Sequence, residues 1–421
     1  MNRTPEPPLR RLAERDLEAA LADTRVAVVL GARQVGKSTL VEQIARSRQE
    51  MGVHTLDDQA TRSRALADPT GFVADLTTPA AIDEVQRAPD ILLAIKQRVD
   101  RDQSPGQFIL TGSANVLTAP TISDALTGRA AYILLHPFTQ GELKGHRESF
   151  IEMLFEGHFP ALHDQALGRG AYASLIAAGG YPEALKRTGS RRTLFFDGYL
   201  KTLMQRDLRS LAALSDGANV QRLLAALAAV STSEVNFQSL GRDLGLAGNT
   251  LRTYANLLET LFLIRRVPPW SGNMFARAIK APKAYISDPG LLCHLVRADE
   301  TRIKTDLDLG GMLFETFAAC ELMRQADYAI EPVEVYHYRD RDQRQVDLLF
   351  ERRDGAVIAV EIKAAASIKQ SDGRGLAYLR DKLGDRFRAG ALLYTGAATL
   401  RLGDRLAAVP LTGLWTDDAS G

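Results

Sequence analysis

A glycine-rich segment carries the clearest chemical pattern in this sequence. It consists of Gly31, Ala32, Arg33, Gln34, Val35, Gly36, Lys37, Ser38 and then Thr39. The segment fits G-x-x-x-x-G-K-[ST] at every fixed position, a pattern whose backbone N–H groups and following helix N-terminus bind phosphate. We therefore predict that residues 31–39 bind ATP, with the Lys37 ammonium at the β- and γ-phosphates and the Ser38 hydroxyl on Mg²⁺.

Two adjacent carboxylates follow the apolar segment that starts at Ala80. They are Asp83 and Glu84. At the end of a buried strand, Asp83 would contact Mg²⁺ directly or through water, and Glu84 would act as the general base that polarises the attacking water. Because proline cannot donate to a central ladder, we expect Pro79 to be the first residue of a short strand.

A third apolar segment, residues 108–110, precedes a group of polar residues. Ser113 is our first choice for a residue that senses the γ-phosphate, and Thr111 and Asn115 are the alternatives; a strand-end turn without such a role is the competing interpretation. Further on, Arg129 is either an arginine finger that stabilises the transferring phosphoryl group or a solvated surface residue. A finger that reaches across a subunit boundary would imply a homo-oligomer.

The segments around these residues alternate between strand-like and helix-like patterns. Residues 26–30 form an apolar β-branched run, residues 39–45 and 91–96 are helix-like, and residues 132–135 are strand-like. Such alternation predicts a parallel sheet covered by helices on both faces. We expect the ATP site at the carboxyl ends of its strands.

A second group of charged residues lies on two predicted strands near the C-terminus. Asp347 is followed by Glu361 and Lys363, and these three resemble the PD-(D/E)XK nuclease signature. In that scheme Asp347 and Glu361 are Mg²⁺ ligands, and Lys363 orients or activates the attacking water. Glu315 lies in a segment that is apolar nearly all round, where a carboxylate is costly unless paired or metal-bound. The resemblance to nucleases of this kind, which often contribute a helix glutamate, implies Glu315 as a further metal ligand, with Glu321 as the second choice.

The turn between these two strands decides whether the second group can assemble. A two-residue loop would pair Asp347 with Ile362 and place the two carboxylates on opposite faces. A three-residue loop with Gly355 in the left-handed conformation would pair Asp347 with Glu361. The Arg353-Asp354-Gly355 sequence favours the three-residue form.

Residues 236–270 read as helix, turn, helix and wing. The first helix is expected at residues 237–244, and the second begins after Gly248 with apolar positions at helical spacing. Arg252, Thr253 and Asn256 fall on its opposite side, as in a recognition helix, and Arg265-Arg266 begin the predicted wing. The pattern favours a winged helix that contacts DNA, while contact with a protein partner is the alternative.

Several of these segments together resemble a family of uncharacterised prokaryotic AAA-type ATPases with a restriction-endonuclease-like C-terminal domain. The segments are residues 28–38, 82–86, 110–113, 127–129, 179–183 and 205–208. The resemblance implies an α/β fold: a P-loop NTPase parallel sheet with a helical lid, a winged helix and a C-terminal α/β restriction-endonuclease-like domain. We place the ATPase core at 1–145, the lid at 146–225, the winged helix at 226–285 and the nuclease-like domain at 286–421.

Composition agrees with a multidomain globular protein. The chain has 421 residues, a formal net charge of +1 and two cysteines, which we expect to be core residues in a reducing compartment. Without an apolar run of transmembrane length or a signal segment, the cytoplasm is the expected location and no membrane partner is expected. A charge of +1 means that DNA contact must come from local basic patches.

Two functions follow from these patterns. The first is an ATP-hydrolysing DNA-processing protein that uses ATP and Mg²⁺ and binds DNA, branched or single-stranded forms included, through its winged-helix and nuclease-like domains. The second is an ATP-dependent switch or scaffold that acts on protein partners and whose nuclease fold is inactive.

Overall fold

The computed structural model describes residues 9–48, 51–112, 126–164, 166–208, 217–272, 277 and 281–416. The chain divides into two compact units. The first takes residues 1–138, 202–215 and 260–262, and the second takes residues 139–201, 216–259 and 263–421. The second unit therefore brings together parts of the segments predicted as lid, winged helix and nuclease-like domain.

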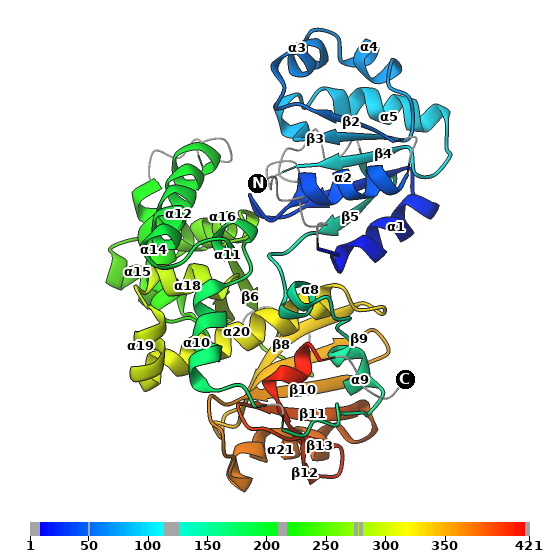
Figure 1. The fold of residues 1–421 in the computed structure, drawn as a ribbon. Coiled ribbons are helices and arrows are strands. Elements are labelled where there is room, and N and C mark those ends of the chain that lie inside the picture. The colour runs from blue at the N-terminus through cyan, green and yellow to red at the C-terminus, as the bar shows by residue number, and fades with distance from the viewer. Residues whose placement is uncertain are drawn as a thin grey trace, which may run out of the picture. The chain divides into compact units, whose positions relative to one another are not determined.

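A five-stranded parallel sheet forms the centre of the first unit (Figure 1). Its order is β2-β3-β4-β1-β5, which puts the strand before the glycine loop between β4 and β5. Each prediction of a strand before a polar motif is confirmed, although β3 begins one residue after Pro79. The strands are β1 (Val26–Leu30), β2 (Gly52–Thr55), β3 (Ala80–Asp83), β4 (Phe108–Thr111) and β5 (Ala130–Leu134).

Helices cover both faces of this sheet, and its central strands are therefore buried on both sides. Val26 and Val28 of β1 pack into one core with residues of the helices α3 to α5, such as Phe72 and Ile95. Ala27, between them, points to the opposite face and is also fully buried. The helices are α1 (Ala13–Asp23), α2 (Lys37–Ser47), α3 (Gln59–Ala67), α4 (Pro69–Ala74) and α5 (Ile91–Arg101).

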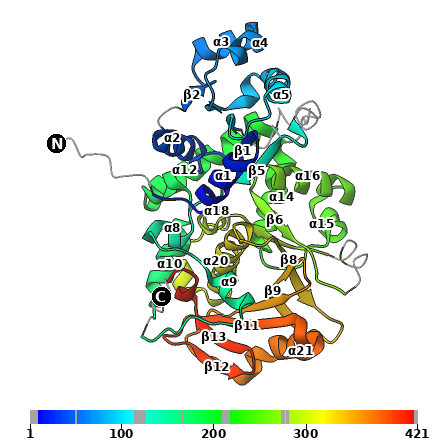
Figure 2. The ribbon, with the colours of Figure 1, turned by 90° about the vertical axis from the view of Figure 1, so that its right-hand side faces the viewer.

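A six-stranded mixed sheet forms the largest element of the second unit (Figure 2). Its order is β12-β13-β11-β10-β9-β8, with parallel pairs at β10–β11 and β11–β13 and antiparallel pairs elsewhere. Helix α21 (Arg374–Leu383) packs against it through Leu376 and Leu379. The strands are β8 (Val333–Arg339), β9 (Gln345–Arg352), β10 (Val357–Ile362), β11 (Phe387–Tyr394), β12 (Leu400–Gly403) and β13 (Leu406–Pro410).

Helices and a two-stranded antiparallel sheet make up the rest of the second unit. The small sheet pairs β6 (Ile264–Val267) with β7 (Lys283–Ile286). The helices are α8 (Gln140–Lys144), α9 (Phe150–Phe155), α10 (Arg169–Ala178), α11 (Pro182–Leu185), α12 (Gly189–Thr202), α14 (Gly217–Ala229), α15 (Phe237–Leu244), α16 (Gly248–Thr260), α18 (Pro289–Leu295), α19 (Glu300–Thr305) and α20 (Leu307–Asp327). Within the described residues, no helix combines the length and apolarity needed to cross a bilayer.

The second unit contains a close contact between Asp288 and the Gly179-Gly180 pair, which is one of the segments that resemble the family. The Asp288 carboxylate is fully buried and caps α18 by accepting from the N–H groups of Gly290 (3.0 Å) and Leu291 (3.1 Å). It also accepts from the Gly180 N–H at 2.7 Å. A Cβ on Gly179 would lie 2.2 Å from Asp288 Oδ1, so only glycine fits there.

Candidate functional site

The glycine loop at the carboxyl end of β1 has the backbone conformation that its sequence predicts. Gly31 (φ +150°) and Gly36 (φ +99°) take up positive φ angles, and Gly36 immediately precedes α2. A Cβ on Gly31 would lie 2.2 Å from the carbonyl oxygen of Leu135. The two glycines thus give the loop its tight path from the strand into the helix.

The Lys37 ammonium is held by the loop itself. It donates to the carbonyl oxygens of Gly31 at 3.1 Å and Ala32 at 2.9 Å, and its side chain is buried. A buried ammonium costs free energy unless polar groups surround it, and the loop supplies them. The charge is thereby positioned at the start of α2, beside the N–H groups of the loop.

Asp83 is the centre of a cluster of hydroxyl groups. Its carboxylate accepts from Ser38 Oγ, at 3.0 Å to each oxygen, from Thr55 Oγ1 at 3.4 Å and from Thr111 Oγ1. Mg²⁺ is bound in proteins by oxygen ligands, commonly one or two protein groups together with substrate phosphates. Ser38 and Asp83 provide such a pair next to the phosphate loop, so the residues present fit the predicted ion.

Glu84 turns out of the strand that holds Asp83. Its backbone is left-handed (φ +61°), its N–H donates to Thr111 Oγ1 at 3.1 Å, and its carboxylate accepts from Gln86 Nε2. Thr111 therefore contacts both acidic residues from the neighbouring strand. The sequence named Thr111 only as an alternative to Ser113, and Ser113 and Asn115 lie outside the described residues.

Arg11, which the sequence did not indicate as a site residue, contacts the end of the glycine loop. Its guanidinium donates to the carbonyl oxygens of Val35 (3.0 Å) and His136 (2.6 Å) and lies 4.2 Å from the centre of the Phe138 ring. These partners are mainly backbone groups distant in sequence. No local pattern around Arg11 could have indicated them.

Arg129 lies at the opposite edge of the sheet from the glycine loop of its own chain. Val26, the first residue of β1, is paired with Ala130, and the Val26 N–H donates to the carbonyl oxygen of Arg129. The guanidinium forms a two-point ion pair with Asp100, with Nη2 to Oδ2 at 2.8 Å. In this structure Arg129 is thus paired with Asp100 at the end of β5 away from the glycine loop, and its role as an arginine finger stays a prediction.

The C-terminal group assembles through the three-residue loop. Gly355 is left-handed (φ +84°), the Arg352 N–H donates to the Ala356 carbonyl, and Val360 pairs with Leu348. This register puts Asp347 opposite Glu361, as the turn sequence predicts. The Ile362 N–H donates to Asp347 Oδ2 at 2.9 Å, and the Lys363 ammonium lies 3.0 Å from Glu361 Oε1.

A lysine that the sequence analysis did not single out lies in the middle of this group. The Lys283 ammonium, from β7, donates to Glu315 Oε1 at 3.2 Å and to Asp347 Oδ1 at 3.0 Å. Burial raises the pKa of Glu361 to about 8 and that of Glu315 to about 7, and the Asp347 charge acts in the same direction on both. A lone lysine at the start of an apolar strand gave no sign of this contact.

The predicted metal centre at Glu315, Asp347 and Glu361 does not fit this arrangement. Two of the three carboxylates already hold the Lys283 ammonium, and in the described part of the chain no group of three or more His, Cys, Asp and Glu side chains is placed to hold a metal ion. The second choice, Glu321, lies elsewhere and accepts from the Gln140 N–H at 2.8 Å.

The predicted recognition helix is α16, which begins at Gly248. Leu251, Tyr254 and Leu258 are buried, whereas Arg252 and Asn256 are exposed. An open hollow of about 900 Å³ lies beside this helix. Its lining includes Asn236 and Gln238 at the start of α15, Arg252 and Asn256 of α16, and Arg266 of β6.

Three family models match the chain in succession. Residues 23–144 match an AAA domain, residues 169–302 match the domain of unknown function DUF8612, and residues 310–414 match the domain of unknown function DUF4143. The first match covers the phosphate loop, the Asp83 cluster and all five parallel strands. Residues 23–144 are an AAA-type P-loop ATPase domain.

Two relatives align with nearly the whole chain. Uncharacterised proteins of Mycobacterium tuberculosis and Mycobacterium bovis are each 29% identical over 412 residues, which cover 97% of this chain and 85% of each relative. Among solved structures, a Walker-type ATPase of Pyrococcus abyssi is 17% identical with a TM-score of 0.41, covering 68% of this chain and 94% of that one. The RuvB Holliday junction branch migration motor of Thermotoga maritima is 19% identical with a TM-score of 0.29, covering 61% and 89%. TM-scores this low do not support an inference of shared function.

Proposed function

We propose that the AAA domain binds ATP with Mg²⁺ and hydrolyses it in the site formed by the glycine loop, Asp83 and Glu84. The observation that carries this proposal is the Asp83 cluster. The hydroxyl that follows the loop lysine, on Ser38, is already within hydrogen-bond distance of the strand-end carboxylate.

Each residue of the site has a distinct part in this scheme. Residues 31–39 present N–H groups to the phosphates, and the Lys37 ammonium exchanges its carbonyl partners for phosphate oxygens. The bound Mg²⁺ supplies charge neutralisation of the β- and γ-phosphates. Glu84 takes the proton of the attacking water, and Thr111 fixes the backbone from which the Glu84 side chain projects.

Two substitutions separate binding from hydrolysis. Lys37→Ala is expected to weaken ATP binding, because the phosphates lose their cation. Glu84→Gln is expected to leave binding intact and to slow hydrolysis by about 10²–10⁴-fold, the usual contribution of a general base. Calorimetric binding and phosphate release measure the two effects, and Glu42→Gln on the exposed side of α2 is the control. Unchanged turnover in Glu84→Gln would exclude Glu84 as the base.

We further propose that α15 and α16 contact DNA, so that the ATPase acts on DNA. Arg242 and Arg252 are exposed, and neither guanidinium has an ion pair or hydrogen bond within the part of the chain that the structure describes. Arginine and amide side chains along the hollow beside α16 are groups that contact phosphates and base edges. A homo-oligomer in which Arg129 reaches a neighbouring site remains part of this proposal.

A further inference from the structure

Two lysines of this chain contact the three carboxylates of the C-terminal group, Glu315, Asp347 and Glu361. The Lys283 ammonium lies between Glu315 on α20 and Asp347 on β9, at 3.2 and 3.0 Å from their nearest oxygens. The Lys363 ammonium lies 3.0 Å from Glu361. We propose that Lys283 is a built-in cation that takes the place of a divalent metal ion, so that this cluster does not bind Mg²⁺.

The first support is the position of the ammonium. A divalent ion shared by Glu315 and Asp347 would have to lie between their oxygens, where the Lys283 nitrogen already is. The other oxygen of Asp347 accepts from the Ile362 N–H, and Glu361 Oε1 is paired with Lys363. Of the three carboxylates, Glu361 Oε2 is a buried oxygen without a hydrogen-bond partner among the described residues, and one such oxygen does not make a Mg²⁺ site.

The second support is the backbone that holds Lys283. In β7 it pairs with Val267 of β6, and its two neighbours in sequence are also anchored. The Pro282 carbonyl accepts from the Val235 N–H at 2.8 Å, and the Ala284 carbonyl accepts from the Thr232 N–H at 3.1 Å. The Lys283 side chain is only 12% exposed. Withdrawing the ammonium would leave it buried without its carboxylate partners, which is strongly unfavourable.

This arrangement limits the chemistry that the C-terminal group can perform. A PD-(D/E)XK cleavage site needs a metal ion at its carboxylates and a lysine free to act on water. Here the lysine of that signature, Lys363, is paired with Glu361, and Lys283 fills the metal position. The unit would therefore keep the nuclease-like strand arrangement for binding or for structural support and would not cut DNA.

Binding of Mn²⁺ tests this inference directly. The nucleotide-free full-length chain is titrated with Mn²⁺, and the bound ion is counted by electron paramagnetic resonance. We expect that Asp347→Asn removes no bound Mn²⁺ from the wild-type protein, because the cluster holds none. We expect Lys283→Met to gain one Mn²⁺ per chain, and we expect adding Asp347→Asn to abolish that gain. Ions at the ATP site are unaffected by Asp347→Asn and cancel in the comparison.

Lys363→Met is the matched control. It removes the ammonium on the other side of the cluster but leaves Lys283 between Glu315 and Asp347, so no Mn²⁺ is gained. Urea unfolding of each variant shows whether it is folded. The inference is overturned if the wild-type protein binds a Mn²⁺ ion that Asp347→Asn removes. It is also overturned if the Lys283→Met protein is folded and gains no Mn²⁺.

Discussion

A single threonine connects the two acidic residues of the ATP site. Thr111 Oγ1 donates to the Asp83 carboxylate and accepts from the Glu84 N–H at 3.1 Å. The residue is fully buried, so neither partner can replace the hydroxyl with bulk water. This hydrogen bond ties the left-handed backbone of Glu84 to the neighbouring strand.

Thr111→Val is therefore expected to slow ATP hydrolysis about tenfold or more, which corresponds to ~1.4 kcal/mol or more of lost positioning. Nucleotide affinity should change little, because the Thr111 hydroxyl is hydrogen-bonded to Asp83 and Glu84 and not to residues 31–39. Single-turnover hydrolysis and calorimetric binding separate the two quantities. Thr55→Val is the matched control, since Thr55 also contacts Asp83 but not Glu84. An equal effect of both substitutions would contradict the role given to Thr111.

His337 provides a pH-dependent prediction at the same scale. Burial, with the nearby Lys283 charge, lowers its pKa to about 4, and its ring lies 3.3 Å from the Ala281 carbonyl oxygen. Between this value and the unfolded pKa of about 6.5, the unfolded chain binds a proton that the folded chain does not. The stability that His337 contributes is thus complete above about pH 6.5 and is lost as the pH falls toward 4.

We expect the difference in unfolding free energy between wild type and His337→Gln to shrink by up to ~1.4 kcal/mol per pH unit on acidification from pH 6.5. The pH dependence that comes from the buried carboxyl groups, whose pKa values are shifted in the opposite direction, is the same in both proteins and cancels in this difference. Urea unfolding of both proteins at several pH values measures it. A difference that stays constant with pH would mean that His337 titrates alike in both states.

The chemistry of local motifs could be predicted from the sequence, whereas contacts between distant segments could not. Lys37 and Ser38 lie in a pattern that needs only a strand, a turn and a helix, and Asp83 ends a second apolar strand, as expected downstream of such a loop. Arg11 and Lys283 act on groups far along the chain, and nothing in their neighbours indicates the partner. Thr111 lies between these cases, because its place at a strand end was evident and its two hydrogen bonds were not.

At the scale of elements, turns and close approaches determine how helices and strands meet. Gly355 in the left-handed conformation produces the three-residue loop that pairs Asp347 with Glu361, and the sequence favoured this register over that of a two-residue loop because Gly355 suits the left-handed position. The contact of Gly179 with Asp288 was not predictable, since it joins residues more than a hundred positions apart. Sequence patterns therefore predict such a contact only when the two residues that make it are close together in the sequence.

Substitution of Gly179 tests the second kind of contact. Gly179→Ala introduces a Cβ 2.2 Å from Asp288 Oδ1 and 2.8 Å from the Gly290 nitrogen, and it also strains a residue with φ +65°. We expect a loss of ~3 kcal/mol or more in unfolding free energy, beyond the ~1 kcal/mol typical of a left-handed alanine. Gly189→Ala is the matched control, because Gly189 also has a positive φ (+52°) but nothing within 4 Å of its Cβ. Equal losses in urea unfolding would attribute the effect to backbone strain alone.

At the scale of the whole molecule, a net charge of +1 means that no general field draws the protein to DNA. Any affinity must come from arginines concentrated on one surface. Arg242 of α15 and Arg252 of α16 meet this condition because both are exposed and line neighbouring hollows that share Asn236 and Gln238. By contrast, Arg265 and Arg266, which the sequence placed at the start of the wing, are paired with Asp327 and Glu259.

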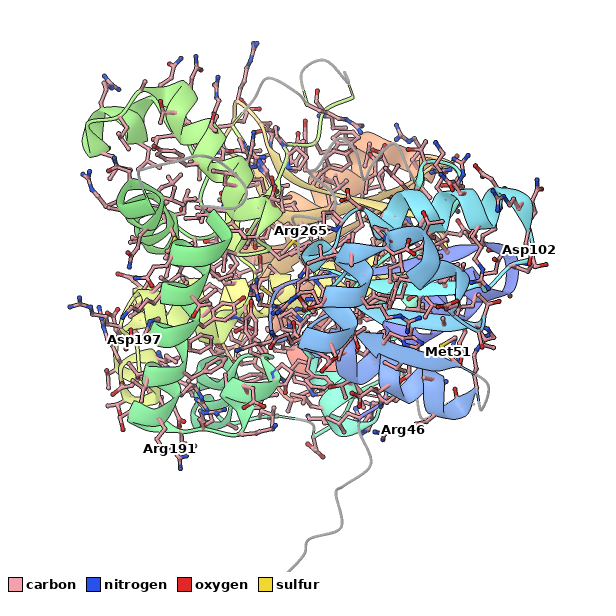
Figure 3. All side chains as sticks on the ribbon, turned by 90° about the horizontal axis from the view of Figure 1, so that it is seen from above. Arg46, Met51, Asp102, Arg191, Asp197 and Arg265 are labelled. Atoms are coloured by element: carbon pink, nitrogen blue, oxygen red, sulfur yellow. The ribbon has the colours of Figure 1, made fainter. Side chains whose placement is uncertain are left out.

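The double substitution Arg242→Ala with Arg252→Ala is expected to weaken DNA binding and to reduce the slope of log K against log salt by about 2, because each arginine releases about one counterion from the phosphates. Fluorescence anisotropy with duplex, branched and single-stranded DNA measures both quantities, and ATPase rates with the same DNAs show whether binding reaches the AAA domain. Arg191→Ala is the control, since the Arg191 side chain is also exposed and points outward near the start of α12 (Figure 3). If the control and the double variant lose affinity alike, the attraction is diffuse and α16 is not a recognition helix. If wild type shows no salt-dependent binding to any of these DNAs, the alternative of an ATP-dependent switch for protein partners gains support. That alternative is consistent with a C-terminal group in which Lys283 occupies the position of the metal ion.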